Sequence, residues 1–248
     1  MSSTTTNSSV PTSTATNSIS PSDVPDLTSY RSVHHAIRTA AHRLASVAPA
    51  VGPGDRIRVH AMRRYWDGFT GEILGHHTLE DDVFFPALAE RSAEMCELMD
   101  RLEADHHLLD ELMDETTATI ARFDRAGASE RAAQLLEHIA SHMDEHLDLE
   151  DERVLPLFEQ HFAVDEYLVL EDQAMKSIGF GKQAFFTVPF VVDSMHEPER
   201  SHVLSSAPMP MRLLYRATRG RFARLERAVF RGAAVPNGSL STRIEVSL

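Results

Sequence analysis

The chain has 248 residues and a formal net charge of -13, with 42% hydrophobic and 25% charged residues, as is ordinary for a soluble globular protein. The negative charge argues against a nucleic-acid-binding protein, which needs a concentrated basic surface, and no apolar run approaches the length of a membrane span. Cys96 is the only cysteine, which excludes an intrachain disulfide and a thiolate metal cage. These features favour a cytoplasmic protein without a membrane or nucleic-acid partner.

In chain order, residues 1–28 are rich in Ser, Thr, Asn and Pro and are expected to form a disordered tail, because they can bury too little apolar surface. Residues 29–162 show apolar residues at helical spacing and no strand-like alternation. We predict four helices there, at about 29–47, 55–91, 93–123 and 129–161, separated by Pro- and Gly-containing links. Short links predict an all-α, up-down-up-down four-helix bundle.

Two prolines, Pro86 and Pro156, fall inside the second and fourth predicted helices, where each is expected to kink or end its helix. Residues 163–248 are expected to form a C-terminal helical extension, with helices at about 164–178 and 209–230 and an apolar segment at 185–192. The last of these helices has an Arg-rich face. The extension is a candidate for binding a protein partner or for self-association.

One pattern occurs twice, 70 residues apart. His76-x-x-x-Glu80-Asp81 runs into Phe84-Phe85-Pro86, and His146-x-x-x-Glu150-Asp151 runs into Val154-Leu155-Pro156. Residues i and i+4 of a helix lie on the same face, one turn apart, so each copy can point an imidazole and a carboxylate at one spot. Two copies on facing helices predict a nitrogen-and-oxygen site for a pair of transition metals.

A further histidine precedes each copy by a similar interval, 42 residues in the first half and 40 in the second. Such a two-fold spacing is typical of a duplicated helical hairpin. Imidazoles suit iron, zinc or copper, bridging carboxylates offset the charge of two cations, and open coordination positions favour non-haem iron. The candidate metal ligands are His34, His76, Glu80, His106, His146 and Glu150.

Three of the candidate histidines have a second histidine beside them in the sequence. Neighbours on a helix diverge by about 100°, so only one of each pair is expected to face the core. His34 is favoured over His35 because it lies three residues before the apolar Ile37, and His106 stands in the same relation to Leu109.

His76 is favoured over His77 because it pairs with Glu80. The rival pairing of His77 with Asp81 stays open, although the second copy has a leucine at the corresponding position. Asp81 and Asp151 are expected behind the ligands or at the surface, since they point about 100° away from the glutamates.

These motifs resemble the hemerythrin-like, HHE cation-binding family, over about residues 30–162 and in the bacterial H…HxxxE…H…HxxxE arrangement. The residues that carry the resemblance are Val33-His34-His35-Ala36-Ile37-Arg38, His76-His77-Thr78-Leu79-Glu80-Asp81, Asp105-His106-His107-Leu108-Leu109 and His146-Leu147-Asp148-Leu149-Glu150-Asp151. The resemblance implies a four-helix bundle around a non-haem di-iron centre with two iron ions. It also implies a role in binding or reacting with dioxygen, peroxide or nitric oxide, or in iron homeostasis.

The sequence departs from the oxygen-carrying members, which use five histidines with His-x-x-x-His on the third helix. Here the third helix has adjacent His106-His107, and a fifth ligand would have to come from a residue such as His142. This departure weighs against reversible oxygen carriage and leaves peroxide chemistry, gas sensing and iron handling open. The alternatives are an iron-homeostasis sensor or buffer that acts through a protein partner without turnover, and a structural bundle that binds zinc or no metal.

Overall fold

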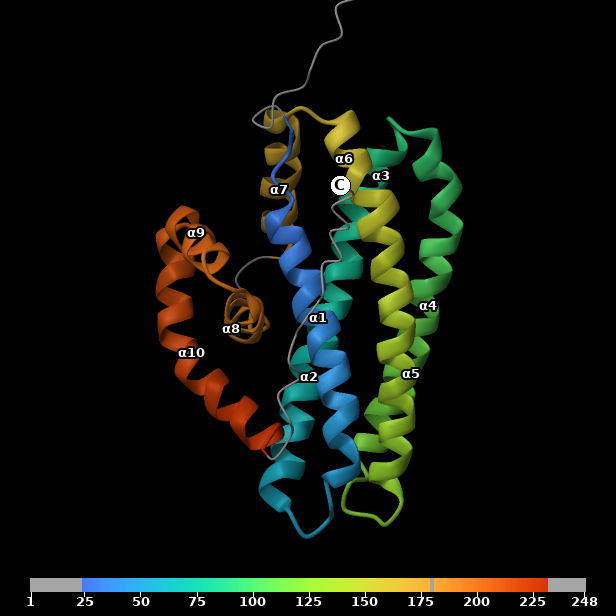
Figure 1. Cartoon of the computed structure of the whole chain (residues 1–248), viewed down its shortest axis with the longest axis vertical. Helices are drawn as coiled ribbons and strands as arrows, with labels where there is room; N and C mark the ends of the chain where they lie inside the picture. The colour runs from blue at the N-terminus through green and yellow to red at the C-terminus, as the bar shows by residue number, and fades with distance from the viewer. Residues whose placement is uncertain (1–23, 179–180, 232–248) are drawn as a thin grey trace, which may run out of the picture.

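The structure is a computed structural model that describes residues 24–178 and 181–231, and within these residues every regular element is helical. Four long helices form the bundle: α1 (Thr28–Val47), α2 (Arg56–Leu79), α4 (Ala93–Ile120) and α5 (Ala128–Leu149). Figure 1 shows them side by side with alternating direction, α1 packing against α5 and α5 against α4. The predicted all-α bundle with additional helices is confirmed.

The second and fourth predicted helices each contain one π-helical turn. η2 (Glu80–Phe84) joins α2 to α3 (Phe85–Ala89), and η3 (Glu150–Val154) joins α5 to α6 (Leu155–His161). The N–H groups of the residues after these turns donate to the carbonyls of Glu80 and Glu150, five residues earlier. Pro86 and Pro156 lie in the first turn that follows. The sequence located these irregularities but did not predict that they are π turns.

Two of the four bundle helices, α2 and α4, begin with a side-chain cap. The Asp55 carboxylate accepts from the N–H of Arg58 at 3.1 Å, and the Ser92 hydroxyl accepts from the N–H of Met95 at 3.3 Å. A 3-10 turn, η1 (Ala48–Ala50), follows α1. Ser129, where the sequence predicts the fourth helix to begin, lies inside the first turn of α5. The helix instead follows Gly127, whose φ of +81° is a conformation that favours glycine.

The bundle interior has two apolar layers with a polar layer between them. One apolar layer includes Ile37, Ile73 and Leu109, which lie within three residues of candidate ligands on the side facing the interhelical loops at 48–55 and 121–127. The other includes Tyr30 and Phe84, toward α3 and α6. The candidate ligands occupy the polar layer, so apolar side chains close it at both ends of the bundle.

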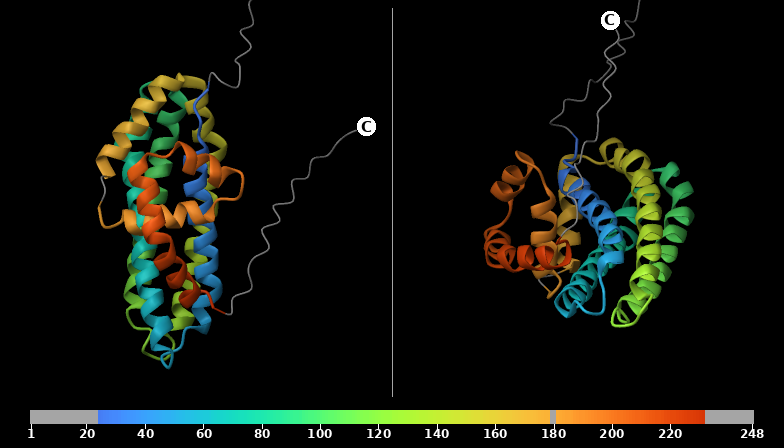
Figure 2. Two further views of the ribbon diagram at one scale, coloured as in Figure 1. Left: turned by 90° about the vertical axis from the view of Figure 1, so that its left-hand side faces the viewer. Right: turned by 60° about the horizontal axis from the view of Figure 1, so that its bottom comes forward.

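Four further helices follow the bundle: α7 (Val164–Ile178), α8 (Ala184–Ser194), α9 (Glu199–Ser206) and α10 (Met209–Val229). Figures 1 and 2 show α8 crossing the bundle and α10 lying along its outside, and α10 packs against α2 and α8. The seam between α8 and α2 is close, because a Cβ at Gly68 would overlap the ring of Phe186. None of the helices described has the length and apolar character that crossing a membrane requires.

Candidate metal centre

The six candidate ligands converge in the polar layer of the bundle. α1 supplies His34, α2 supplies His76, α4 supplies His106 and α5 supplies His146, while the two π turns begin with the glutamates. All six side chains are buried, with residue exposures between 0% and 8%. Histidine and glutamate are rarely buried this deeply without a partner, so the convergence itself indicates a binding site.

Each glutamate faces one histidine from each half of the bundle. Oε1 of Glu80 lies 3.1 Å from Nε2 of His76, and its Oε2 lies 3.6 Å from Nε2 of His106. Oε2 of Glu150 lies 3.3 Å from Nε2 of His34, and its Oε1 lies 3.3 Å from Nε2 of His146. Carboxylates that lie between two sets of imidazoles in this way can bridge two cations.

The ligand atoms form two groups that could each hold a metal ion. The members of each group lie within 4.8 Å of one another; one group is His34, His76, Glu80 and Glu150, and the other is His77, Glu80, His106 and His146. Within the described chain, Nε2 of all five histidines and three of the four glutamate oxygens are buried without a hydrogen-bond partner. A cation is the partner that satisfies such a set, so the residues fit a pair of metal ions.

His77 is the residue that the sequence-based choice placed outside the site. The structure buries both His76 and His77, at 8% and 4% exposure, so the expectation that only one of the pair faces inward is wrong. The His77 ring stacks on that of His106, with centroids 3.9 Å apart and planes 9° from parallel. His142, the fifth histidine suggested by the sequence, belongs to neither group; its Nε2 lies 3.6 Å from Asp105.

The model of the hemerythrin HHE cation-binding domain family matches residues 27–158. The chain is a member of this family. The matched region runs from α1 to α6 and contains every residue of the two ligand groups, so the family assignment from the sequence is confirmed. No curated protein and no solved structure matches the chain.

Carboxylates behind the histidines of this hemerythrin-family bundle fix the orientation of the rings. Nδ1 of His34 lies 2.9 Å from Oδ1 of Asp151, and Nδ1 of His106 lies 3.1 Å from Oδ1 of Asp81. A carboxylate at Nδ1 holds the proton there and leaves Nε2 as the free donor to a metal. Asp81 and Asp151 therefore lie behind the candidate ligands. This is one of the two locations that the sequence predicts for them, the other being the surface.

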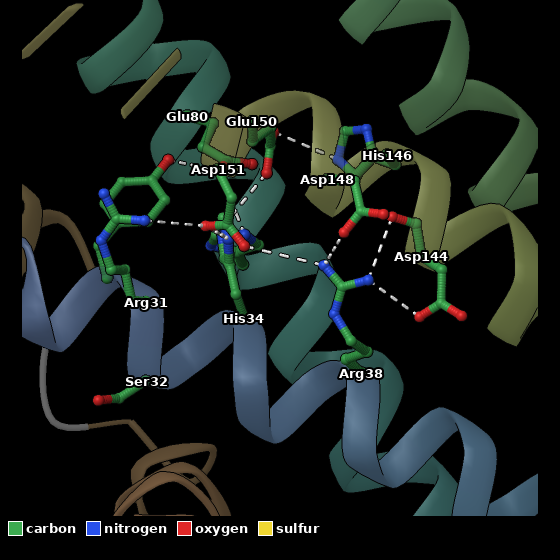
Figure 3. A network of polar contacts seen from close by, with 12 residues as sticks. Arg31, Ser32, His34, Arg38, Glu80, Asp144, His146, Asp148, Glu150 and Asp151 are labelled. Atoms are coloured by element: carbon green, nitrogen blue, oxygen red, sulfur yellow. Dashed lines mark hydrogen bonds and ion pairs between the residues drawn. The ribbon is translucent and has the colours of Figure 1, made fainter. Parts of the chain in front are cut away.

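Asp151 also belongs to a network of charges on the outer side of α1. Figure 3 shows it between His34 and two arginines, with Arg38 reaching further to Asp144 and Asp148 on α5. Its carboxylate oxygens lie 3.9 Å from Arg31 and 3.8 Å from Arg38. The negative charge that supports His34 is thus shared with two cations.

Tyr30 is a functional candidate that the sequence-based reasoning missed. Its hydroxyl donates to Oε1 of Glu80 at 2.5 Å, and the residue is buried, at 8% exposure. Its ring contacts the rings of His34 and His76, edge to face. The spacing of four residues between Tyr30 and His34 was the available signal, because it places both on one face of α1.

Burial sets the protonation preferences of the centre in the absence of a cation. It raises the pKa of Glu80 and of Glu150 well above the usual range, and the charge of Glu80 adds to the effect on Glu150. Burial also lowers the pKa of His76 and His77, helped by neighbouring histidines, and lowers the pKa of His146 to about 4. Neutral imidazoles are ready to bind a metal, whereas the glutamates gain from one because a cation offsets their negative charge.

Proposed function

We propose that the chain is a non-haem di-iron protein whose centre binds or reacts with a small oxidant or gas, namely dioxygen, peroxide or nitric oxide. The observation that carries the proposal is the pair of glutamates whose oxygens each face a histidine of a different half. We propose His34, His76, Glu80, His106, His146 and Glu150 as ligands, with His77 as a seventh.

The burial of the centre supports a small ligand. No residue in either group is more than 8% exposed, and apolar layers lie above and below them. A substrate with a large polar group would have to enter this interior and lose its hydration, which is costly. Diatomic gases and hydrogen peroxide are small enough to diffuse through the packed bundle.

Side chains of this protein would control the proton inventory around a bound ligand. When bound, two irons would supply redox equivalents and open coordination positions. The Tyr30 hydroxyl holds a proton at Oε1 of Glu80, inside the apolar layer that excludes bulk water. Asp151 and Asp81 hold protons at Nδ1 of His34 and His106 and so keep both Nε2 atoms directed inward.

The test is the metal content and absorption spectrum of protein purified without added metal, beside the E80Q/E150Q variant. The matched control is E130Q/E137Q, which changes two exposed glutamates of α5. We expect two irons per chain and a near-ultraviolet charge-transfer band in the wild type and the control, and loss of both in E80Q/E150Q. Dioxygen, peroxide and nitric oxide are then added in turn. Zinc, no metal, or no band after iron loading would contradict the proposal.

A second candidate is an iron sensor or buffer that works through a partner without turnover. It is favoured by the contact between the ligand helix and the C-terminal helices. The hydroxyl of Thr187 on α8 donates to the buried carboxylate of Glu72, which lies one helical turn before His76 on α2. Strong loss of helicity on chelation, a changed contact between α8 and α2, and no consumption of peroxide would favour this function over the first.

A further inference from the structure

Helix α10 presents a row of arginines that no described residue neutralises. It contains six arginines, all exposed, and within residues 24–178 and 181–231 none of them forms an ion pair. Its one acid, Glu226, pairs with Arg43 at 2.6 Å. Four of the arginines lie within about 80° of one another around the helix axis and form the arginine face: Arg212, Arg216, Arg219 and Arg227.

The side of α10 that lies about 100° around the helix axis from the arginine face is packed against the protein. Tyr215, Phe222 and Val229 are buried against the rest of the protein, and Phe222 contacts the rings of Tyr65 and Phe186. The helix is therefore fixed by its apolar side and holds its arginines outward on a rigid support. Six exposed arginines on one helix are conspicuous in a chain of net charge -13.

Helix α4 carries the complementary charge. Nine of its residues are Asp or Glu, against one arginine. Four exposed carboxylates lie within about 100° of one another, and no cation among the described residues pairs with them. These form the acidic face: Glu97, Asp100, Glu111 and Asp114. Helices of 21 and 28 residues are about 30 and 40 Å long, so one face can cover the other.

The two faces cannot neutralise each other within one molecule. Figures 1 and 2 show α10 and α4 on opposite sides of the protein, with the bundle between them. The segments outside the described residues add little charge, because Asp23 and Glu245 are the only acids in 1–23 and 232–248. Nucleic acid or an anionic membrane would approach a chain whose overall charge repels it.

We propose that the arginine face of one molecule docks on the acidic face of a second copy. Because the two faces lie on opposite sides, the contact is heterologous, and each added copy leaves one face of each kind free. Exposed ion pairs are individually weak, so the association depends on several pairs acting together and is weakened by salt. This inference is independent of the metal proposed above.

The experiment measures the average mass of the full-length protein by sedimentation velocity over a range of concentrations, at low salt and at about 0.5 M salt. We expect assemblies larger than a monomer at low salt, growing with concentration, and monomers at high salt. R212E/R216E/R219E and E97R/D100R/E111R are each expected to be monomeric at low salt. The control matched to R212E/R216E/R219E is R64E/R122E/R125E, which lowers the net charge by the same amount at exposed arginines elsewhere and is expected to associate like the wild type.

Mixing the two reversed variants tests the pairing itself. Each variant lacks a complementary face in its own copies, whereas the acidic α10 of one fits the basic α4 of the other, so the mixture is expected to associate. Circular dichroism confirms that the variants fold. A monomeric wild type at low salt, equal loss in the control, or a mixture that stays monomeric would overturn the proposal. Wild-type monomers that bind phosphatidylserine vesicles or DNA through these arginines would overturn it in favour of another partner.

Discussion

In the half of the bundle formed by α1 and α2, Tyr30 lies four residues before His34 and donates to Glu80. In the half formed by α4 and α5, the corresponding position before His106 is Leu102, which is buried and apolar. Four residues after the same histidines stand Arg38 and Asp110. The halves therefore repeat the candidate ligands, 70 or 72 residues apart, while differing in the groups around them.

The difference extends to the charges behind the histidines. Asp151, which supports His34, shares its charge with Arg31 and Arg38. Asp81 supports His106 without an ion pair to any described arginine or lysine, and its charge contributes to a raised pKa at Asp110, behind the larger effect of burial. The carboxylate behind His106 is thus less neutralised by cations than the one behind His34. The α4–α5 group also has three imidazoles, against two in the α1–α2 group. On these two grounds we expect the α4–α5 metal position to bind a cation more tightly than the α1–α2 position.

The largest expected effect separates the two positions directly. H34Q leaves the α1–α2 group with a single imidazole, His76, so we expect one of two metals per chain to be lost. H106Q leaves the α4–α5 group with two imidazoles, His77 and His146. This variant is expected to retain both metals, with a reduced affinity at the α4–α5 position. Metal analysis after equilibrium dialysis measures the stoichiometry. Equal losses in the two variants would contradict the inequivalence of the halves.

Removing His77 is expected to act in opposite directions on the metal-free and metal-bound protein. Both ring nitrogens of His77 are buried without a hydrogen-bond partner, and the equivalent residue of the second half is Leu147. H77L should stabilise the metal-free protein by about 1–3 kcal/mol, because an unsatisfied buried polar group is replaced by an apolar one. The same variant should bind the α4–α5 metal less tightly.

Urea unfolding in the presence of a chelator measures the first effect, and metal titration measures the second. H107L is the control, because His107 is exposed on α4 and belongs to neither group. A metal-free H77L protein that is less stable than the wild type would show that the ring packs favourably without a cation.

The glutamates shared by both halves predict a pH dependence of stability in the metal-free protein. Their pKa values are raised by burial, so their contribution is fully present below the unfolded pKa of 4.5 and is lost as pH rises toward the raised values. His146 has a pKa lowered to about 4, so its contribution is present above 6.5 and is lost as pH falls from 6.5 toward 4. We expect the free energy of unfolding to decrease as pH rises above 6.5.

E80Q/E150Q removes both titrating glutamates and should remove most of this decrease between pH 6.5 and pH 8.5. Chemical unfolding with chelator present at several pH values measures it. An identical slope in the wild type and the variant would place the pH dependence elsewhere in the chain.

The sequence predicted the bundle and the convergence of the six candidate ligands because both depend on local spacing. A His-x-x-x-Glu pair lies on one helix face whatever surrounds it, and its repetition identified the two halves. The choice of His76 over His77 assumed that only one of two neighbours faces inward, whereas the α-helical α2 buries both. His77 packs against His106 of another helix, which is a tertiary contact without a local signature.

Tyr30 and the π turns show a different limit of the sequence. The four-residue spacing of Tyr30 from His34 is compatible with core packing as well as with a hydrogen bond to Glu80, and only the position of α2 decides between them. The π turns start at Glu80 and Glu150, and the prolines located each irregularity without indicating its type. The extra residue in such a turn changes the direction of the following side chains, which local propensity does not report.

The smallest expected effect tests the outer charges, which contact no ligand position directly. R38M removes a cation that Asp151 shares, so Asp151 supports His34 more strongly and the α1–α2 metal should bind more tightly. D110N removes negative charge near His106, so the α4–α5 metal should bind less tightly. Outer groups of this kind change metal affinity by about 10–100-fold, and the partial exposure of Arg38 places the expected change near the lower end.

Stepwise cobalt titration followed by absorbance resolves the two positions. In the wild type the α4–α5 position should fill first and the α1–α2 position second. R38M should raise the affinity of the second step, and D110N should lower the affinity of the first. Each substitution should therefore bring the two steps closer together. Steps that move apart in either variant would show that the arginine and the aspartate position their neighbours by packing, and that charge does not distinguish the two halves.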